Sequence, residues 1–173
     1  MRTKSKLLIL SDLWGKEKSD WLEHYTEPLN ESFELQYYDC CELGSVNKTD
    51  YRQEALHQQF VNGGIEKALN KLTELEKEPV HVLAFSIGGT IAWQFALKTG
   101  SVKSLYAISS TRLRYETAKP EAETKLYFGE NDPFKPSDIW FDELGIALEL
   151  ISHKGHMVYT ESEFAKSLSQ QIR

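Results

Sequence analysis

The chain has 173 residues, a length that suits one compact domain with a substantial core, and we expect residues 1–173 to form a single domain. Its 20 basic and 26 acidic residues give a formal charge of −6, and the basic residues are scattered, which argues against a nucleic-acid partner. No apolar run is long enough to span a membrane, and the run at 7–10 is shorter than the apolar part of a signal peptide, so no membrane association is expected.

Strand and helix patterns alternate along the chain, which is typical of a parallel sheet covered on both faces. We expect strands at about residues 6–10, 33–38, 80–85, 102–108, 124–128 and 147–151. We expect helices at about residues 19–29, 50–61, 65–77, 89–99, 137–143 and 161–172. The predicted fold is therefore α/β, with three layers and a mostly parallel sheet of about six strands.

Several helix boundaries have a local chemical signal. Ser19 is a predicted N-cap for the first helix, and the run Asn62-Gly63-Gly64 should break the long central helical region in two. Gly100 is expected to end the helix that starts near residue 89, and Pro79 to stop the helix before the third strand.

Two cysteines, Cys40 and Cys41, follow the second predicted strand. Adjacent cysteines rarely form a disulfide with each other, so we expect free thiols that pack the end of this strand. Free thiols favour a reducing, cytoplasmic location.

The segment 80–89, VHVLAFSIGG, runs from an apolar strand through a serine into a helical pattern. A sharp strand-to-helix turn strains the serine backbone and requires small residues two places before and after it, which Ala84 and Gly88 provide. The turn would raise the Ser86 hydroxyl above the carboxyl edge of the sheet and present the Ile87 amide to an oxyanion. An ordinary strand-to-helix turn is the competing interpretation of this segment alone.

Two later strand ends carry the residue types that activate a serine. Asp132 follows the strand at 124–128 in a Gly/Asn turn, and His156 follows the last strand. A histidine can take the serine proton, while an aspartate can orient that histidine and stabilise its cation. His153 is the alternative base, but we favour His156 because Gly155 beside it would permit a close approach. Other roles are expected for the remaining histidines, which are His24 and His57 (solvated) and His81 (packed in the sheet).

With serine, aspartate and histidine in this order, each after a strand, the sequence resembles the α/β-hydrolase superfamily over nearly all of its length. The segment 7–15, LLILSDLWG, looks like the oxyanion loop of dienelactone-hydrolase-like members. This resemblance implies a catalytic triad of Ser86, Asp132 and His156, with the backbone amides of Leu13 and Ile87 as oxyanion donors. It also implies the strand order 2-1-3-4-5-6, with a switch point beside the first and third strands.

The sequence departs from that family pattern in two places. Dienelactone hydrolases use a cysteine where this chain has Ser86, and the usual first glycine of the elbow is Ala84. The subfamily and its substrate therefore do not carry over.

Residues 109–123 leave no room for the helical lid found in larger hydrolases, so an open cleft and a small acyl substrate are expected. Trp14, Trp21, Phe134 and Met157 lie near predicted strand ends and are candidates to line an acyl pocket, although each could instead belong to the core. The predicted function is hydrolysis of a small ester or thioester through an acyl-enzyme, without a metal or other cofactor. The alternative is a non-catalytic member of the fold that binds a ligand or partner. The sequence does not indicate an oligomeric state.

Overall fold

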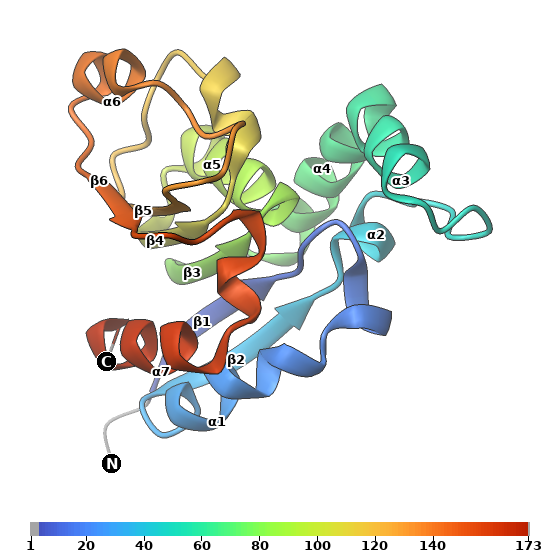
Figure 1. The fold of residues 1–173 in the computed structure, drawn as a ribbon. Coiled ribbons are helices and arrows are strands. Elements are labelled where there is room, and N and C mark those ends of the chain that lie inside the picture. The colour runs from blue at the N-terminus through green and yellow to red at the C-terminus, as the bar shows by residue number, and fades with distance from the viewer. Residues whose placement is uncertain (1–3, 173) are drawn as a thin grey trace.

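A six-stranded, fully parallel sheet forms the centre of the molecule, in the order β2-β1-β3-β4-β5-β6 (Figure 1). The computed structural model describes residues 4–172. The strands are β1 (Ser5–Leu10), β2 (Phe33–Tyr38), β3 (Val80–Phe85), β4 (Val102–Ile108), β5 (Glu123–Gly129) and β6 (Leu148–Ile151). Both the six predicted strands and their predicted order are confirmed.

Helices cover both faces of the sheet. The helices α1 (Glu23–Leu29) and α7 (Ser162–Ile172) pack together on one face. The opposite face carries α2 (Cys40–Leu43), α3 (Gln53–Gln59), α4 (Ile65–Leu75), α5 (Ile87–Thr99) and α6 (Asp138–Leu144). Because successive strand residues point to opposite faces, β1 sends Leu7 and Ile9 into the core under α7, and Leu8 and Leu10 into the core under α5.

Short helical turns connect these elements. They are the 3-10 turns η1 (Gly15–Lys18), η2 (Asp20–Leu22), η4 (Thr111–Tyr115) and η5 (His156–Thr160), and the π-type turn η3 (Phe60–Gly64). The predicted break at 62–64 is confirmed, because Gly63 has a φ of 121° inside η3. Gly100 closes α5 in the left-handed conformation, as predicted, with a φ of 63°.

Two predicted boundaries are wrong. Ser19 does not cap the first helix, because its hydroxyl donates to the carbonyl of Lys16 and the chain first forms η2. Pro79 is not the residue that stops α4, which ends at Leu75 where Glu76 turns to an extended conformation. The carboxylate of Glu76 is buried there and accepts from Lys6 Nζ at 2.7 Å.

The cysteines behave as predicted, as free thiols buried at the end of β2. They begin α2, which the sequence did not predict, and Asp39 caps this helix by accepting from the amides of Cys41 and Glu42. Burial raises the pKa of the Cys41 thiol to about 12.

The connection from β4 to β5 contains only η4, so the described residues form no lid domain. No helix among residues 4–172 combines the length and the apolar composition needed to cross a membrane. The carboxyl edge of the sheet is therefore covered by loops and single turns, and these loops bring the predicted site residues together.

Candidate active site

The turn from β3 into α5 holds Ser86 in a strained backbone conformation, with φ 50° and ψ −118°. The Ser86 amide still donates to the Ile108 carbonyl of β4 at 2.8 Å, which fixes the turn to the sheet. A side chain at Gly88 would place its Cβ 2.3 Å from the Ser11 carbonyl oxygen, so only glycine fits there. The small residue that the elbow pattern predicts after the serine is thus required by contact with the end of β1.

Three side chains from separate strand ends meet above this turn. The Ser86 hydroxyl lies 3.2 Å from Nε2 of His156, and Nδ1 of His156 lies 2.7 Å from Oδ2 of Asp132. Asp132 is fully buried, whereas His156 is about one third exposed. Burial opposes ionisation of Asp132, but the hydrogen bond from His156 and the amide of Phe134 outweigh it and hold the Asp132 pKa below its usual value.

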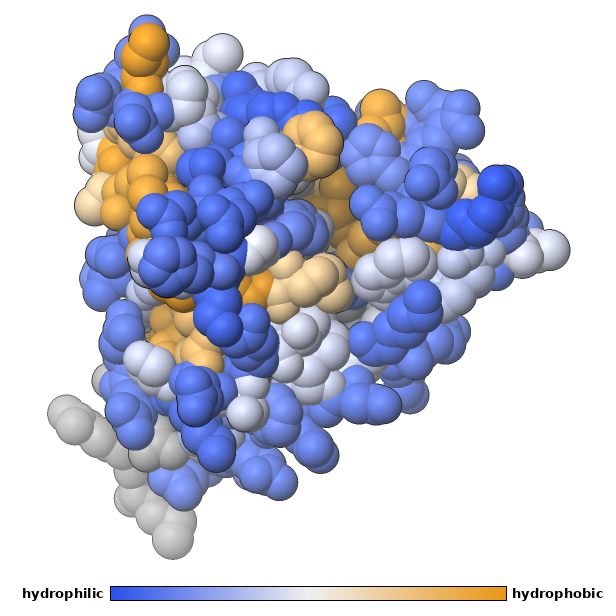
Figure 2. Space-filling view, in the orientation of Figure 1, coloured by the Kyte–Doolittle hydropathy of each residue, from blue (hydrophilic) through white to orange (hydrophobic). Residues whose placement is uncertain are grey.

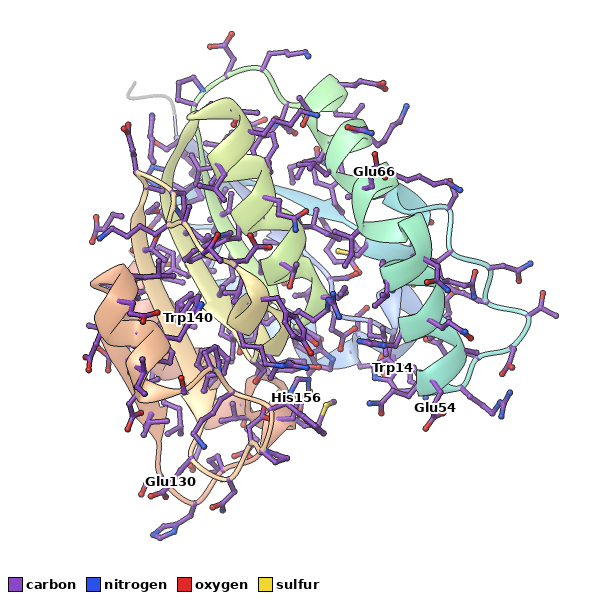
Figure 3. The ribbon with its side chains drawn as sticks, turned by 90° about the horizontal axis from the view of Figure 1, so that it is seen from above. Trp14, Glu54, Glu66, Glu130, Trp140 and His156 are labelled. Carbon is purple, nitrogen blue, oxygen red and sulfur yellow. The ribbon has the colours of Figure 1, made fainter. Side chains whose placement is uncertain are left out.

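His153 lies outside this group. Its side chain is 91% exposed and faces Glu130, which Figure 3 shows away from His156. The predicted reason for preferring His156 is wrong, however, because a Cβ added at Gly155 would meet no atom within 4 Å, so this position does not require glycine. The close approach is at Gly129, where a Cβ would lie 2.3 Å from the Gly155 carbonyl oxygen. Gly129 therefore seats the histidine loop against the end of β5.

Ser109 is a further residue of the site that the sequence analysis did not identify. It is fully buried at the end of β4, and its hydroxyl donates to the His156 carbonyl at 2.6 Å. Like Ser86, it has a left-handed backbone, with φ 53°. Ser109 therefore ties the start of η5 to the sheet.

The backbone amides of Leu13 and Ile87 lie at matching positions beyond two paired strands. Leu10 of β1 pairs with Ala84 of β3, and Leu13 and Ile87 are each three residues further on. Neither amide has a hydrogen-bond acceptor among residues 4–172. The Cys41 thiol holds the Leu13 carbonyl at 3.2 Å, which fixes this peptide against α2.

A second buried aspartate, Asp12, lies beside the site and was missed by the sequence analysis. Its carboxylate accepts from the Trp14 amide at 3.0 Å and from the Tyr159 hydroxyl at 2.9 Å. Burial raises the Asp12 pKa to about 6, and the hydrogen bonds from Tyr159 and Trp14 only partly offset it. The loop after β1 is thereby joined to η5, which carries His156.

The predicted substrate-binding side chains lie around this group with different exposures. Met157 is adjacent to His156 and is 46% exposed, and Phe134 on the Asp132 loop is 62% exposed. Trp14 is half-buried under the Lys18 ammonium, which lies 3.9 Å from the ring centroid. Figure 3 shows Trp14 and His156 on the same side of the molecule. Trp21 packs edge-to-face against aromatic rings of the core and does not line this space.

The face above the carboxyl edge is hollowed, and Figure 2 shows hydrophobic surface inside the hollow between η4 and α3. Two other surface cavities, each of about 350 Å³, contain none of the three meeting side chains. One lies beside β2 and α2, and the other between α2 and the α3–α4 junction.

The other histidines match their predicted surroundings in part. His81 packs in β3 with its Nδ1 2.7 Å from the Ser104 hydroxyl, and His57 is exposed on α3, while His24 is only partly exposed. Among residues 4–172, no group of three His, Cys, Asp or Glu side chains is arranged to hold a metal ion.

Comparison with solved structures identifies the fold. A proposed hydrolase of the α/β superfamily from Xanthomonas campestris pv. campestris has a TM-score of 0.68 and 18% identity, covering 98% of each chain. A lidless α/β serine hydrolase from Xanthomonas campestris has a TM-score of 0.62 and 14% identity, covering 99% of this chain and 82% of its own. A proposed dienelactone hydrolase from Klebsiella pneumoniae has a TM-score of 0.67 and 14% identity, covering 98% of this chain and 85% of its own.

No protein-family model and no curated protein sequence matches the chain. The structural likeness nevertheless extends over nearly the whole chain and includes a lidless relative. The chain therefore has the fold of the α/β-hydrolase superfamily, in a form without a lid domain among its described residues.

Proposed function

We propose that this protein is a serine hydrolase that cleaves small esters or thioesters through an acyl-enzyme intermediate. The observation that carries the proposal is the hydrogen-bonded series from Ser86 through His156 to Asp132 at a strained strand-to-helix turn. The fold likeness to proteins described as hydrolases supports the same class of activity.

In this mechanism, Nε2 of His156 takes the Ser86 proton as Oγ attacks the carbonyl carbon of the substrate. The protonated histidine then gives its proton to the leaving alcohol or thiol, and the acyl group stays on Oγ. Asp132 holds Nδ1–H and stabilises the imidazolium, which is consistent with the lowered pKa of its carboxyl group. Water activated by the same histidine releases the acid and restores Ser86.

The free amides of Leu13 and Ile87 would donate to the oxyanion of each tetrahedral intermediate. Amides in this role are fixed before the reaction begins, and loss of one such donor typically costs about 3 kcal/mol of transition-state stabilisation. The Cys41 contact to the Leu13 carbonyl and the position of Ile87 at the start of α5 support this assignment.

The alternative is a protein of this fold that binds a ligand or partner without turnover. Such a protein has no physical need for a nucleophile, a base and an orienting acid in one hydrogen-bonded series. The observed series therefore favours the enzyme.

Turnover of p-nitrophenyl butyrate by the purified protein and its variants tests the proposal. We expect hydrolysis by the parent protein, and a loss of roughly 10⁴-fold or more in Ser86→Ala. The control is Ser45→Ala, because Ser45 shares the left-handed conformation, with φ 53°, but is exposed and lines a cavity that contains none of Ser86, Asp132 and His156. Equal turnover by Ser86→Ala and the parent would contradict the proposal.

A further inference from the structure

The turn η4 starts at the candidate active site and carries two arginines above it. It follows Ser109, which donates to the His156 carbonyl, and Ser110, whose hydroxyl fills the space next to Gly89 at the start of α5. The turn η4 also packs against α5. Arg112 and Arg114 therefore belong to a segment that is anchored at the start of α5 and at the histidine loop.

Arg114 has hydrogen-bond acceptors within the protein. Its guanidinium donates to the Thr111 carbonyl at 2.8 Å and to the Phe134 carbonyl at 3.4 Å, and it reaches the Tyr115 hydroxyl at 3.0 Å. These contacts connect η4 to the loop that carries Asp132. Arg114 therefore holds η4 against that loop.

Arg112, in contrast, makes no such hydrogen bonds with residues 4–172. No hydrogen bond from its guanidinium and no carboxylate within 4 Å is found among residues 4–172, and its Nε is buried without a partner. The ring of Tyr115 lies beside it, with its centroid 5.1 Å from Cζ. A guanidinium stays charged at all ordinary pH values, and a buried N–H without an acceptor is costly. The two Nη nitrogens of Arg112 are not buried, and they donate no hydrogen bond to residues 4–172, so an anion bound at these nitrogens would give the guanidinium the acceptor that the protein does not provide.

A second positive charge lies close to Arg112, because Arg114 is on the same turn. On α3, the partial burial of the His57 ring and then the charges of Arg112 and Arg114 lower the His57 pKa. The chain as a whole carries a formal charge of −6, so this local concentration of positive charge runs against the average. The field of the two arginines would attract an anionic substrate to η4.

We propose that Arg112 binds an acidic group of the substrate, so that the preferred substrates are small esters carrying a second, ionised carboxylate or phosphate-type group. The planar guanidinium suits bidentate binding of either group. The substrate would lie across the hollow, with its ester carbonyl at Ser86 and its anionic end at η4. This inference rests on the proposed hydrolase function for its kinetic consequence, but not for the binding of the anion.

Matched esters test the kinetic consequence. Ethyl pentanoate and ethyl hydrogen glutarate differ by a carboxylate in place of a methyl group, and ethyl 4-phosphonobutanoate carries a phosphonate instead. We expect kcat/KM to be higher for an anionic ester, and Arg112→Gln to lower that value about tenfold or more, mainly through KM, while the neutral ester is unaffected. Arg112→Lys keeps the positive charge but lacks the planar guanidinium, so its kcat/KM for the anionic ester should lie between those of the parent and Arg112→Gln.

The control variant is Arg52→Gln, because Arg52 is exposed and already paired with Asp50. It should leave all three esters unchanged. The anionic ester that loses more in Arg112→Gln identifies carboxylate or phosphonate as the natural group. Equal effects of Arg112→Gln on neutral and anionic esters would overturn the inference and leave the proposed function standing.

Binding to a protein that cannot turn over separates the two proposals. Glutarate and methylphosphonate are titrated into Ser86→Ala while the arginine Nε–H resonances are followed by NMR. We expect one of the two anions to shift the Arg112 resonance, and that shift would support the anion site even if no ester were hydrolysed. An Arg112 resonance unmoved by both anions would overturn it.

Discussion

Two aspartates, each just beyond the carboxyl end of a strand, have nearly the same local hydrogen bonds and opposite pKa shifts. Asp12 follows β1 and Asp132 follows β5, and each is buried with Oδ1 accepting from the amide two residues ahead, at 3.0 and 3.1 Å. Each Oδ2 accepts from a side chain of η5, from the Tyr159 hydroxyl in one case and from His156 Nδ1 in the other. Burial raises the pKa of Asp12 to about 6, whereas the pKa of Asp132 lies below its usual value.

The partner side chain is one cause of this difference, and the deeper burial of Asp12 and the charge of Lys135 near Asp132 act in the same direction. A phenol donates one hydrogen bond but carries no charge, so it offsets only part of the cost of burying a carboxylate. A histidine can become a cation, and its attraction favours an ionised aspartate. The same turn thus gives a carboxylate suited to stabilise an imidazolium at Asp132, and a carboxyl group that holds loops together at Asp12.

The largest expected difference is in activity. Asp132→Asn should lower kcat by about 10⁴-fold, because an amide at this position favours the wrong imidazole tautomer. Asp12→Asn should lower it by only about tenfold, since this residue orients the loop of Leu13 and does not touch the histidine ring. Rates on p-nitrophenyl butyrate, with circular dichroism to verify folding, measure both. Equal losses would contradict the distinction.

The pH dependence of the free energy of unfolding should also distinguish the two aspartates. The Asp12 pKa is raised from 3.8 to about 6, so the protonated form favours the fold, and this stability is complete below about pH 4 and lost as pH rises through 6. That shift corresponds to about 3 kcal/mol. We expect Asp12→Asn to raise the free energy of unfolding at pH 8 by up to this amount, measured by urea denaturation.

The pKa of Asp132 shifts in the opposite direction, so its contribution to folding stability depends on pH in the opposite way. Its lowered pKa means that the ionised form favours the fold, and this stability is present above the ordinary pKa and lost as pH falls through the folded value. Asp132→Asn should therefore destabilise the protein near neutral pH. A variant pair that shifted stability in the same direction at pH 8 would contradict the account.

A smaller change in activity is expected when the Tyr159 hydroxyl is removed. Tyr159→Phe removes the hydrogen bond to Asp12 and keeps the ring, so the Asp12 pKa should rise above about 6 and kcat/KM should fall several-fold, by about tenfold at most. Carboxyl ¹³C NMR measures the titration. Tyr25→Phe is the control, because the Tyr25 hydroxyl donates to the Tyr159 carbonyl and not to the carboxylate. An unchanged Asp12 titration in Tyr159→Phe would show that the phenol has no influence on it.

The smallest effect is expected at the other loop histidine. His153 is almost fully exposed beside Glu130, so His153→Ala should leave kcat/KM on p-nitrophenyl butyrate unchanged. His156→Ala, measured in parallel, should lose activity as Ser86→Ala does. Activity that is lost in His153→Ala and kept in His156→Ala would identify His153 as the general base.

The sequence predicts Ser86, Asp132 and His156 because each follows an apolar strand, and because the elbow needs small neighbours that can be recognised locally. It does not predict the contact between Asp12 and Tyr159, which joins residues 147 positions apart, with no local pattern to mark it. The helix α2 has a visible N-cap in Asp39 but only four residues, too few to show a helical period. The unpartnered state of Arg112 depends on what surrounds η4, and only the folded chain shows that.

Covalent labelling with a fluorophosphonate tests the central claim most directly, because the probe reacts with an activated serine and its adduct mimics the tetrahedral intermediate. We expect one adduct, on the peptide that contains Ser86, absent after heat denaturation and absent in His156→Ala. Ser109 and Ser45, which share the left-handed backbone of Ser86, should stay unlabelled in the folded protein. A folded protein that remains unlabelled at Ser86, or is labelled at another serine, would contradict the assignment of Ser86 as the nucleophile.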